Sequence, residues 1–346
     1  MKETIDELLT KAFELKASDI HLTIGMPPVF RIHGDLKRYG TEEMKADFTE
    51  LVAKTTIPGK LFNAFKESGQ IDYSYEVPGV SRFRVNAFQQ RGAVSIAFRT
   101  IPTQIPTIEE LQMPDVLKSL AATPQGLILV TGPTGSGKST TLAAMLRYIN
   151  ETMRKHIITL EDPIEYVHAH GSSIIDQREV GFDTDSFAAG LRASLRQDPD
   201  VILVGEMRDL ETISTAITAA ETGHLVLATL HTWSAASTID RIIDVFPHGQ
   251  QAQIRVQLAG VLTAVLSQRL FPRVDKSGRR AATELMINNP AIANLIRSEK
   301  VHQIPNVIQT NRSMGMHMMS ASVKQLLDQA IISYDVAIPY LEGDES

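Results

Sequence analysis

Residues 132–140 carry a spacing of glycine, lysine and hydroxyl side chains that can bind a triphosphate. The residues are Gly132, Pro133, Thr134, Gly135, Ser136, Gly137, Lys138, Ser139 and Thr140, and the first eight match the pattern G-x-x-x-x-G-K-[ST]. Glycines let backbone N–H groups turn toward an anion, and a helix that starts here adds its positive dipole end. Lys138 would then reach the β- and γ-phosphates, and the Ser139 hydroxyl would bind Mg²⁺. An apolar strand pattern precedes the segment and a helix pattern follows it, so we predict a site for ATP and Mg²⁺ rather than a chance glycine-rich turn.

Carboxylates follow two apolar runs downstream of this loop. Glu161, Asp162 and Glu165 come after the first run, and Glu206 comes after the second. Ligands of open α/β sheets bind outside the carboxyl ends of the strands, so these acids are placed to reach a bound nucleotide. Hydrolysis needs a carboxylate that orients water and accepts its proton, and Mg²⁺ needs oxygen ligands. We assign the first role to Glu165, and the second to Glu206 with Ser139. The division of roles among these acids stays open, since any one of them can instead be a solvated charge in a loop.

Two histidines bracket the last apolar run of this region. His224 opens the predicted strand 224–229, and His231 lies just beyond its end. This spacing puts the two rings at opposite ends of a strand, too far apart to bind one metal ion. A role as γ-phosphate sensor or at a subunit interface is therefore predicted, against the alternative that each is a structural histidine.

Four arginines lie on or beside a predicted hairpin near residue 90. They are Arg82, Arg84, Arg91 and Arg99. Arg82 and Arg84 are two residues apart and so project from the same strand face. Guanidinium groups delivered by a neighbouring subunit can stabilise the charge that develops on a transferred phosphoryl group. From composition alone, these arginines are equally well explained as residues that act on a neighbouring subunit's nucleotide and as surface or salt-bridge residues.

The elements ahead of the loop predict a small mixed α/β domain over residues 1–100. Apolar residues recur at helical spacing over residues 2–16. Short β-patterns follow at residues 19–23, 29–33, 71–77, 81–89 and 93–100. A polar turn containing Gly92 joins the last two, which predicts a hairpin. Pro102, Pro106 and Pro114 then interrupt regular structure, so residues 101–116 are predicted to be an interdomain linker or, alternatively, a rigid docked arm.

Residues 117–346 predict a P-loop domain with a mainly parallel sheet and a helical C-terminal part. Near-continuous apolar runs suit strands that helices cover on both faces. The predicted strands are 126–131, 156–160, 201–204 and 224–229. Helical patterns cover 138–150, 251–267, 290–298 and 320–332.

The bulk composition excludes several classes of protein. The chain has 346 residues, of which 43% are hydrophobic, and a formal net charge of -6. This length suggests about two domains, and the hydrophobic content is too high for a disordered chain. The negative charge argues against a motor that grips nucleic acid, because phosphate backbones attract basic proteins. The absence of cysteine excludes disulfides and cysteine-ligated zinc and fits the cytoplasm. The apolar runs are too short to span a bilayer, so we predict no direct membrane insertion.

Taken together, these motifs resemble the secretion ATPase superfamily of type II secretion and type IV pilus motors. Residues 18–22 are similar to the opening of its first domain, and residues 132–140 to its Walker A motif. Residues 158–166 are similar to its Asp box, 201–209 to its Walker B motif and 222–232 to its His box. The resemblance implies an α/β fold class, with a PAS-like α+β domain followed by a RecA-like P-loop ATPase domain. It also implies that Glu165 is the catalytic base, and that the subunits form a homohexamer in which first-domain arginines reach the adjacent nucleotide. The resemblance further implies that the protein is cytoplasmic and is recruited peripherally to an inner-membrane pilus platform protein, where it works with other pilus ATPases.

Two C-terminal segments are similar to those of the pilus retraction motors. Residues 291–300 resemble their AIRNLIRE segment, with departures at Ala293 and Ser298, and residues 316–319 resemble M-H-T-M with Met318 in place of threonine. We do not expect the long N-terminal extension of assembly motors, and the sequence has no cysteine for their tetracysteine loop. We therefore expect a hexameric ATPase that powers pilus retraction and twitching motility. The alternatives are an assembly or competence-type secretion ATPase, and a non-motor nucleotide-dependent regulator.

Overall fold

The computed structural model describes residues 2–341, and the chain divides into two compact units. The first unit runs to Gln104 and also includes the short segment Glu165–Val167. The second contains Ile105–Ile164 and the chain from His168 onward. The division after Gln104 falls inside the proline-bearing stretch 101–116. Met1 and residues 342–346, at the ends of the predicted domain ranges, lie outside the described residues.

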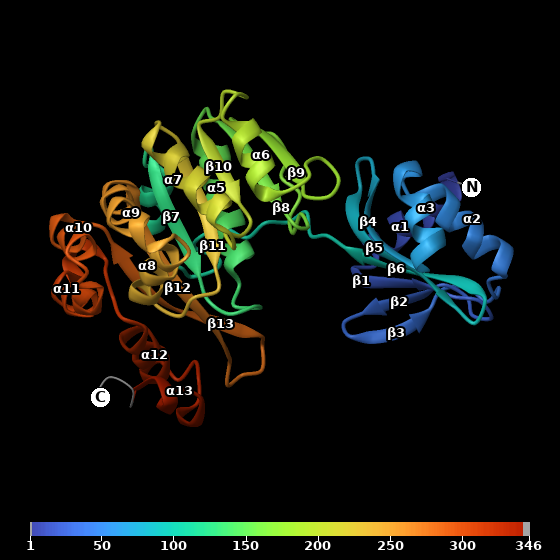
Figure 1. Cartoon of the computed structure of the whole chain (residues 1–346). Coiled ribbons are helices and arrows are strands. Elements are labelled where there is room, and N and C mark those ends of the chain that lie inside the picture. Colours follow the sequence, from blue (N-terminus) through green and yellow to red (C-terminus); the bar gives the residue numbers. More distant parts are fainter. Residues whose placement is uncertain (1, 342–346) are drawn as a thin grey trace. The chain divides into compact units, whose positions relative to one another are not determined.

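The first unit is an antiparallel sheet with helices packed on it (Figure 1). Within residues 2–104 the strand order is β3-β2-β1-β6-β5-β4, and neighbouring strands are antiparallel. The strands are β1 (Ala17–Leu22), β2 (Val29–Ile32), β3 (Asp35–Arg38), β4 (Gln70–Val77), β5 (Ser81–Gln90) and β6 (Ala93–Thr100). The helices are α1 (Lys2–Glu14), α2 (Ala46–Thr56) and α3 (Gly59–Ser68). Phe83, Val85 and Ala87 of β5 are buried while the residues between them are not, so one sheet face forms the core and the other can carry charge.

The predicted α+β character and the predicted hairpin of this unit are confirmed. β5 and β6 pair along their lengths, and the turn between them has positive φ at Arg91 (51°) and Gly92 (78°). Two consecutive positive φ values match the twist of a two-residue hairpin loop. The sequence patterns missed β3, α2 and α3. β3 is exposed throughout, so no apolar alternation marks it, and its pairing with β2 is what makes it a strand.

The second unit contains a mainly parallel sheet, as predicted. Within residues 105–341 the strand order is β13-β12-β7-β11-β10-β8-β9. The strands are β7 (Gly126–Thr131), β8 (His156–Glu161), β9 (Ile174–Glu179), β10 (Val201–Val204), β11 (Leu225–Leu230), β12 (Leu262–Pro272) and β13 (Arg279–Ile287). Neighbouring strands are parallel except β12 with β13. The predicted strands β7, β8, β10 and β11 are confirmed to within a residue at each end.

Helices cover both faces of this sheet, which explains the near-continuous apolar strands. Leu127 and Leu129 of β7 pack in a core with α6–α11, whereas Ile128 and Val130 of the same strand pack with α4 and α5. The helices are α4 (Val116–Ala121), α5 (Lys138–Thr152), α6 (Phe187–Ser194), α7 (Leu210–Glu221), α8 (Ala235–Asp244), α9 (His248–Val261), α10 (Pro290–Arg297) and α11 (Ile304–Thr310). The predicted helices at 138–150 and 290–298 correspond to α5 and α10.

The helix predicted over residues 251–267 is wrong beyond Val261. α9 ends there, and Leu262 begins β12, which pairs in parallel with β7 and antiparallel with β13. An apolar run of this kind suits either a buried helix or a buried strand. The two neighbouring strands decide the outcome, because they satisfy the backbone hydrogen bonds of β12 on both of its edges. β12 therefore lies directly beside the strand that leads into the glycine loop.

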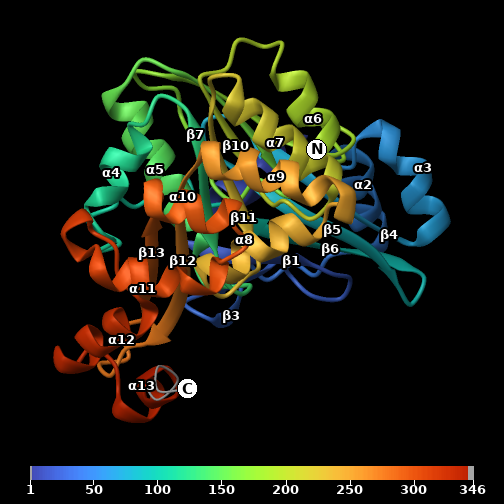
Figure 2. The ribbon, with the colours of Figure 1, turned by 60° about the vertical axis from the view of Figure 1, so that its left-hand side comes forward.

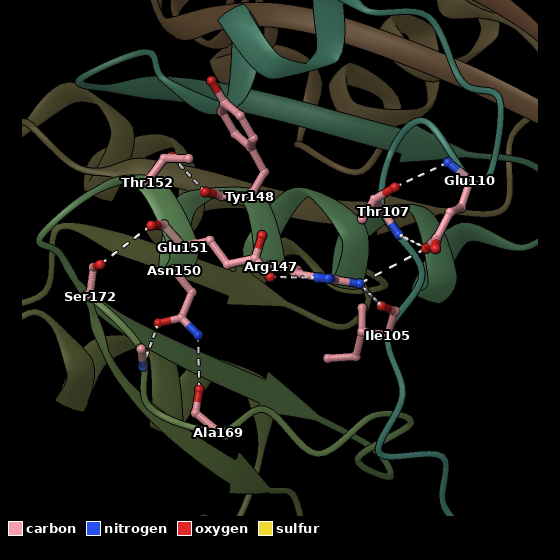
Figure 3. A network of polar contacts seen from close by, with 11 residues as sticks. Ile105, Thr107, Glu110, Arg147, Tyr148, Asn150, Glu151, Thr152, Ala169 and Ser172 are labelled. Carbon is pink, nitrogen blue, oxygen red and sulfur yellow. Dashed lines mark hydrogen bonds and ion pairs between the residues drawn. The ribbon is translucent and has the colours of Figure 1, made fainter.

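Residues 105–113 of the proline-bearing stretch pack into the second unit. Ile108 and Met113 are buried in the same core as the inner face of α5. Arg147 of α5 donates to the Ile105 carbonyl, and its guanidinium lies 3.9 Å from the Glu110 carboxylate (Figure 3). This part of the stretch is a docked arm and not a free tether.

The described chain ends in α12 (Met319–Asp328) and α13 (Tyr334–Leu341), which lie together beyond β13 (Figure 2). Val323 and Leu326 of α12 pack on Phe271 of β12 and Ala337 of α13 in a small separate core. The helix predicted over 320–332 therefore ends early, at Asp328. No helix within residues 2–341 is both long enough and apolar enough to cross a bilayer.

Candidate active site

β7 runs into a glycine loop that turns sharply before α5 begins at Lys138. Gly132, Gly135 and Gly137 have φ values of 140°, 77° and 89°, which side-chain-bearing residues rarely adopt. A Cβ on Gly132 would also lie 2.2 Å from the Gln268 carbonyl oxygen. Gly137 is the N-cap of α5 and carries no side chain that could cap the helix. The first-turn N–H groups of α5 are therefore left to an anion, which the helix dipole also favours.

The Lys138 side chain folds back over the loop. Its Nζ donates to the carbonyl oxygens of Gly132 at 2.8 Å and Pro133 at 3.0 Å. Burial lowers the pKa of Lys138 below the usual lysine value, and the nearby Glu206 carboxylate opposes this shift. A buried ammonium held only by neutral carbonyls gains strongly from a phosphate, because the new partner carries full negative charge.

Ser136 gives a second indication of an anion site. Its Oγ is buried and has no hydrogen-bond partner among the residues that the structure describes. Buried hydroxyls are normally satisfied, because an unpaired one costs free energy. The hydroxyl points into the loop, 2.8 Å from where a Cβ on Gly132 would lie. A phosphate oxygen in the loop would accept its hydrogen bond, so the residues present fit a bound nucleotide.

Gln268 of β12 supports the loop, although no sequence pattern had marked it as a site residue. Its Nε2 donates to the Ser136 carbonyl at 2.6 Å, and its Oε1 accepts from the Thr141 hydroxyl at 2.8 Å. The Gln268 side chain is buried. A glutamine in an otherwise apolar buried run was the available clue, but only the pairing of β12 with β7 brings it to the loop.

Glu206 and His231 meet beside the loop, at the carboxyl edge of the sheet. The Glu206 carboxylate lies 3.4 Å from His231 Nε2 and 2.8 Å from Arg208 Nε. Thr131 and Leu230 are register partners, so the residues that follow them, Gly132 and His231, leave neighbouring strands side by side. The structure thus brings Lys138, Glu206 and His231 into one region, as predicted from their strand ends.

Oxygen donors suited to Mg²⁺ are present here, but not a complete set. No group of three or more His, Asp or Glu side chains within residues 2–341 can hold a metal ion by itself. Ser139 is exposed on the first turn of α5, and the Glu206 carboxylate faces the same edge. Hydroxyl and carboxylate oxygens are donors that Mg²⁺ prefers, and it usually completes its shell with water and substrate phosphates.

The acids around residue 161 have separate environments. The Glu161 side chain is buried and accepts from Thr159 Oγ1 at 2.6 Å and Gln177 Nε2 at 3.1 Å. Asp162 and Glu165 are exposed. Glu165 begins the segment Glu165–Val167 of the first unit. Glu161 is therefore committed to the β8–β9 sheet edge, whereas Glu165 is displayed on a surface.

His224 is not brought to the glycine loop of its own chain. It precedes β11, at the amino end of the strand, and its Nδ1 lies 2.9 Å from the Ala219 carbonyl oxygen. A six-residue strand spans roughly 20 Å, which separates His224 from the edge where His231 lies. The strand direction therefore puts His224 at the edge of the sheet opposite the glycine loop of its own subunit, and its role in nucleotide binding stays a prediction. An interface role stays a prediction.

Charged residues form a row across the polar face of the first unit. Arg31, Asp19, Arg99 and Arg84 are successive register partners on β2, β1, β6 and β5. Arg99 Nε donates to Asp19 Oδ1 at 2.9 Å, and Arg31 Nε lies 3.9 Å from the same carboxylate. Partial burial raises the pKa of Asp19, but hydrogen bonds from Arg99 and Ser18 outweigh it and hold the pKa below its usual value. Asp19 thus holds the two arginines on either side of it, Arg31 and Arg99, and Arg84 lies next in the row beside Arg99.

The remaining predicted arginines lie on the same hairpin. Arg82 is partly buried on the face shared with Arg84 and is paired across the strands with Glu76. Arg91 is exposed in the turn at the hairpin tip. The structure therefore groups Arg82, Arg84 and Arg99 on one face and places Arg91 at the far end.

A loop that presents N–H groups, a buried ammonium and an unsatisfied hydroxyl to one point selects a phosphate group, and a parallel sheet lies behind it. These features define the second unit as a P-loop nucleotide-binding domain. The chain belongs to the family described as Type II/IV secretion system protein, whose sequence model matches residues 1–333.

Individual relatives match nearly the whole chain. The type IV pilus retraction ATPase PilT of Pseudomonas aeruginosa is 50% identical over 333 residues, covering 96% of both chains. The twitching motility protein of Neisseria gonorrhoeae is 47% identical over 338 residues, covering 96% of this chain and 90% of its own. A crystal structure of the pilus retraction motor PilT with bound ADP superposes with a TM-score of 0.88 at 50% identity, covering 97% and 96%. The predicted resemblance to the pilus retraction motors is confirmed.

Proposed function

We propose that this protein is an ATPase motor subunit that powers type IV pilus retraction. The observation that carries the proposal is the loop at residues 132–138, which combines positive-φ glycines, the buried Lys138 ammonium and the unsatisfied Ser136 hydroxyl. Near-complete coverage by a retraction ATPase and by a retraction motor with bound ADP supports the nucleotide and the direction of the motor.

The loop residues 132–140 would bind the triphosphate of ATP. Backbone N–H groups and the Ser136 hydroxyl would hold the phosphate oxygens, while Lys138 would move from its carbonyl partners to the γ-phosphate. Ser139 and Glu206 would hold Mg²⁺, which neutralises phosphate charge when bound. His231 would orient the Glu206 carboxylate through their close contact.

Glu165 would act as the general base. A base must reach the attacking water, and Glu165 is exposed. Glu161 is less suited, because its buried carboxylate already accepts from Thr159 and Gln177. Proton transfer from water to the Glu165 carboxylate would generate the hydroxide that attacks the γ-phosphorus.

The working state would be a homohexamer with shared sites. Arg84 and Arg99 are exposed on a polar sheet face outside the P-loop domain, and Arg82 shares that face. Such guanidinium groups are suited to a nucleotide on the next subunit. We assign residues 1–100 to the domain that supplies these arginines, residues 101–116 to the interdomain linker and residues 117–346 to the ATPase domain. Arg91, at the hairpin tip, and His224, at the opposite sheet edge, would serve interfaces.

The ring would sit on the cytoplasmic side of an inner-membrane pilus platform protein, alongside other pilus ATPases, without nucleic acid. Restoring the gene to a retraction-deficient strain tests this. We expect twitching to return with the wild-type chain and not with Lys138→Ala. Loss of the gene should leave abundant non-retracting pili. Loss of all pili would instead identify an assembly motor, and absence of steady-state ATP turnover by the purified protein would identify a regulator.

A further inference from the structure

The segment that carries Glu165 leaves the second unit after Ile164 and returns at His168. It is only three residues long, so whatever fixes its two ends also fixes the backbone from which the Glu165 carboxylate projects. The inference below rests on the proposed role of Glu165 as general base.

The outgoing end is held by a buried carboxylate. The backbone N–H of Ile164 donates to Glu179 Oε2 at 3.3 Å, and both residues are buried. Glu179 is the last residue of β9, which is hydrogen-bonded in parallel to β8. The contact therefore ties the residue before Glu165 to the sheet edge.

The returning end is held by a neighbouring side chain of the same strand. The N–H of His168 donates to Gln177 Oε1 at 2.8 Å, and Gln177 Nε2 donates to Glu161. Burial lowers the pKa of His168 to about 4, so its ring is neutral at physiological pH. An uncharged buried ring can stay packed at this end of the segment.

Asn150 holds the chain that follows. Its Nδ2 donates to the Ala169 carbonyl at 2.8 Å (Figure 3). Its Oδ1 accepts from the N–H groups of Gly171 at 3.0 Å and Ser173 at 3.3 Å. Its own carbonyl accepts from the N–H of Ser172 at 2.8 Å. A Cβ on Gly171 would lie 2.9 Å from Asn150 Oδ1, so glycine is what permits this close approach. Asn150 thus holds Ala169, Gly171 and Ser173 through its side chain and Ser172 through its backbone carbonyl.

Asn150 belongs to α5, the helix that starts at Lys138. We infer that Asn150, with Gln177 and Glu179, positions Glu165 by holding the chain on both sides of the three-residue segment that carries it. These three are positioning residues, since each acts through the backbone and none is placed to touch the nucleotide.

Steady-state ATPase kinetics of the full chain test the inference. We expect Asn150→Ala to lower kcat about 10- to 100-fold, because small misplacements of a catalytic group have effects of this size. The KM for ATP and the affinity for ADP should stay within about twofold, because the phosphate loop is untouched. Asn288→Ala is the matched control, since Asn288 donates to the Ala259 and Leu262 carbonyls of the same unit, away from Glu165. It should lower the melting temperature comparably and leave kcat unchanged.

A conservative pair covers the case in which Asn150→Ala does not fold. Glu179→Gln keeps an oxygen that accepts from Ile164 and should keep most of the turnover, whereas Glu179→Ala should lose it as Asn150→Ala does. Single-turnover hydrolysis in a Glu165→Gln background should show no further loss from Asn150→Ala, because both act on the same group.

Equal kcat for Asn150→Ala and Asn288→Ala, equal kcat for the two Glu179 variants, or additive losses with Glu165→Gln would each overturn the inference. If Glu165→Gln itself turns over normally, the proposed base and the inference fall together. If Glu165→Gln is inactive while Asn150→Ala is normal, only the inference falls.

Discussion

Gln268 donates a hydrogen bond from its side-chain Nε2 to the carbonyl oxygen of Ser136, at 2.6 Å and fully inside the protein. Since Gln268 Oε1 also accepts from Thr141, one amide holds the middle of the phosphate loop and the first turn of α5 in fixed relation. The loop geometry is thus set from a neighbouring strand as well as by its own glycines.

Gln268→Leu should loosen the loop and weaken nucleotide binding. The substitution keeps the side chain's approximate size but leaves the Ser136 carbonyl and the Thr141 hydroxyl without their partner, at a cost of about 1–3 kcal/mol for each. We expect a lower melting temperature and at least about a tenfold weaker affinity for ADP, measured by titration calorimetry. Gln257→Leu is the control, because the Gln257 side chain donates to Glu221, at the other edge of the sheet. Unchanged affinity in Gln268→Leu would show that the glycines suffice.

Lys138→Ala should abolish ATP turnover. Backbone N–H groups cannot replace a full charge at the γ-phosphate, and loss of one such group costs about 100-fold or more in rate. Phosphate release assays check this. Lys155→Ala makes the same chemical change at a half-exposed lysine that pairs with Asp200, and should keep turnover. Near-normal turnover in Lys138→Ala would mean that the nucleotide binds elsewhere.

Glu165→Gln and Glu161→Gln should separate chemistry from stability. The first should bind ATP normally and lose hydrolysis about 100-fold or more, because an amide cannot accept the proton from water. The second should keep hydrolysis while lowering the melting temperature, because it alters a buried network with Thr159 and Gln177. The reverse result would reassign the base.

Glu206→Gln should raise the Mg²⁺ concentration needed for half-maximal turnover.

Mixing two inactive variants should restore activity if sites are shared between subunits. Lys138→Ala and Arg84→Ala subunits combined in one ring would form some interfaces with an intact loop facing an intact arginine. Activity should partly return in the mixture, measured after subunit exchange is shown by native mass spectrometry. Lys138→Ala mixed with Glu165→Gln is the control and should stay inactive, because both changes affect the nucleotide of one subunit. Absence of recovery in the first mixture would exclude Arg84 as a residue acting in trans.

The His156 ring should make stability depend on pH. Burial lowers the pKa of His156, but its hydrogen bonds to the Asp176 carboxylate and the Asp198 carbonyl outweigh it, so the pKa is raised. A raised pKa means that the folded state binds the proton more tightly than the unfolded state. The stabilisation is complete below the unfolded pKa of about 6.5 and is lost as pH rises through the folded value. His156→Gln should therefore lower the melting temperature more at about pH 6 than at about pH 9. An equal effect at both values would contradict this, and His248→Gln, at an exposed site, is the control.

The sequence predicts well those structural features that depend on residues close together along the chain. The loop at 132–140 is a local motif, and β7, β8, β10 and β11 are recognisable because burial on both faces makes each strand apolar throughout. β12 was misassigned because an apolar run is compatible with helix or strand until its neighbours in the sheet are known.

What the sequence missed depends on partners far away along the chain. Gln268 reaches a carbonyl 132 positions earlier, and no local pattern announces such a contact. Glu161 and Glu165 have the same chemistry, and only burial separates a structural carboxylate from an exposed one. The order of Arg31, Asp19 and Arg99 follows from strand register, which composition does not contain.

The docked arm at residues 105–113 has a mechanical consequence. Ile108 and Met113 share a core with α5, so a displacement of that helix during turnover would carry the arm with it. Residues 101–104 would then be the flexible connection between the arm and the first unit. Pro102 limits its flexibility, because proline fixes its own φ. Because this linker is only four residues long, a small movement of α5 at the nucleotide site would be passed on to the first unit. A longer flexible linker would absorb the same movement.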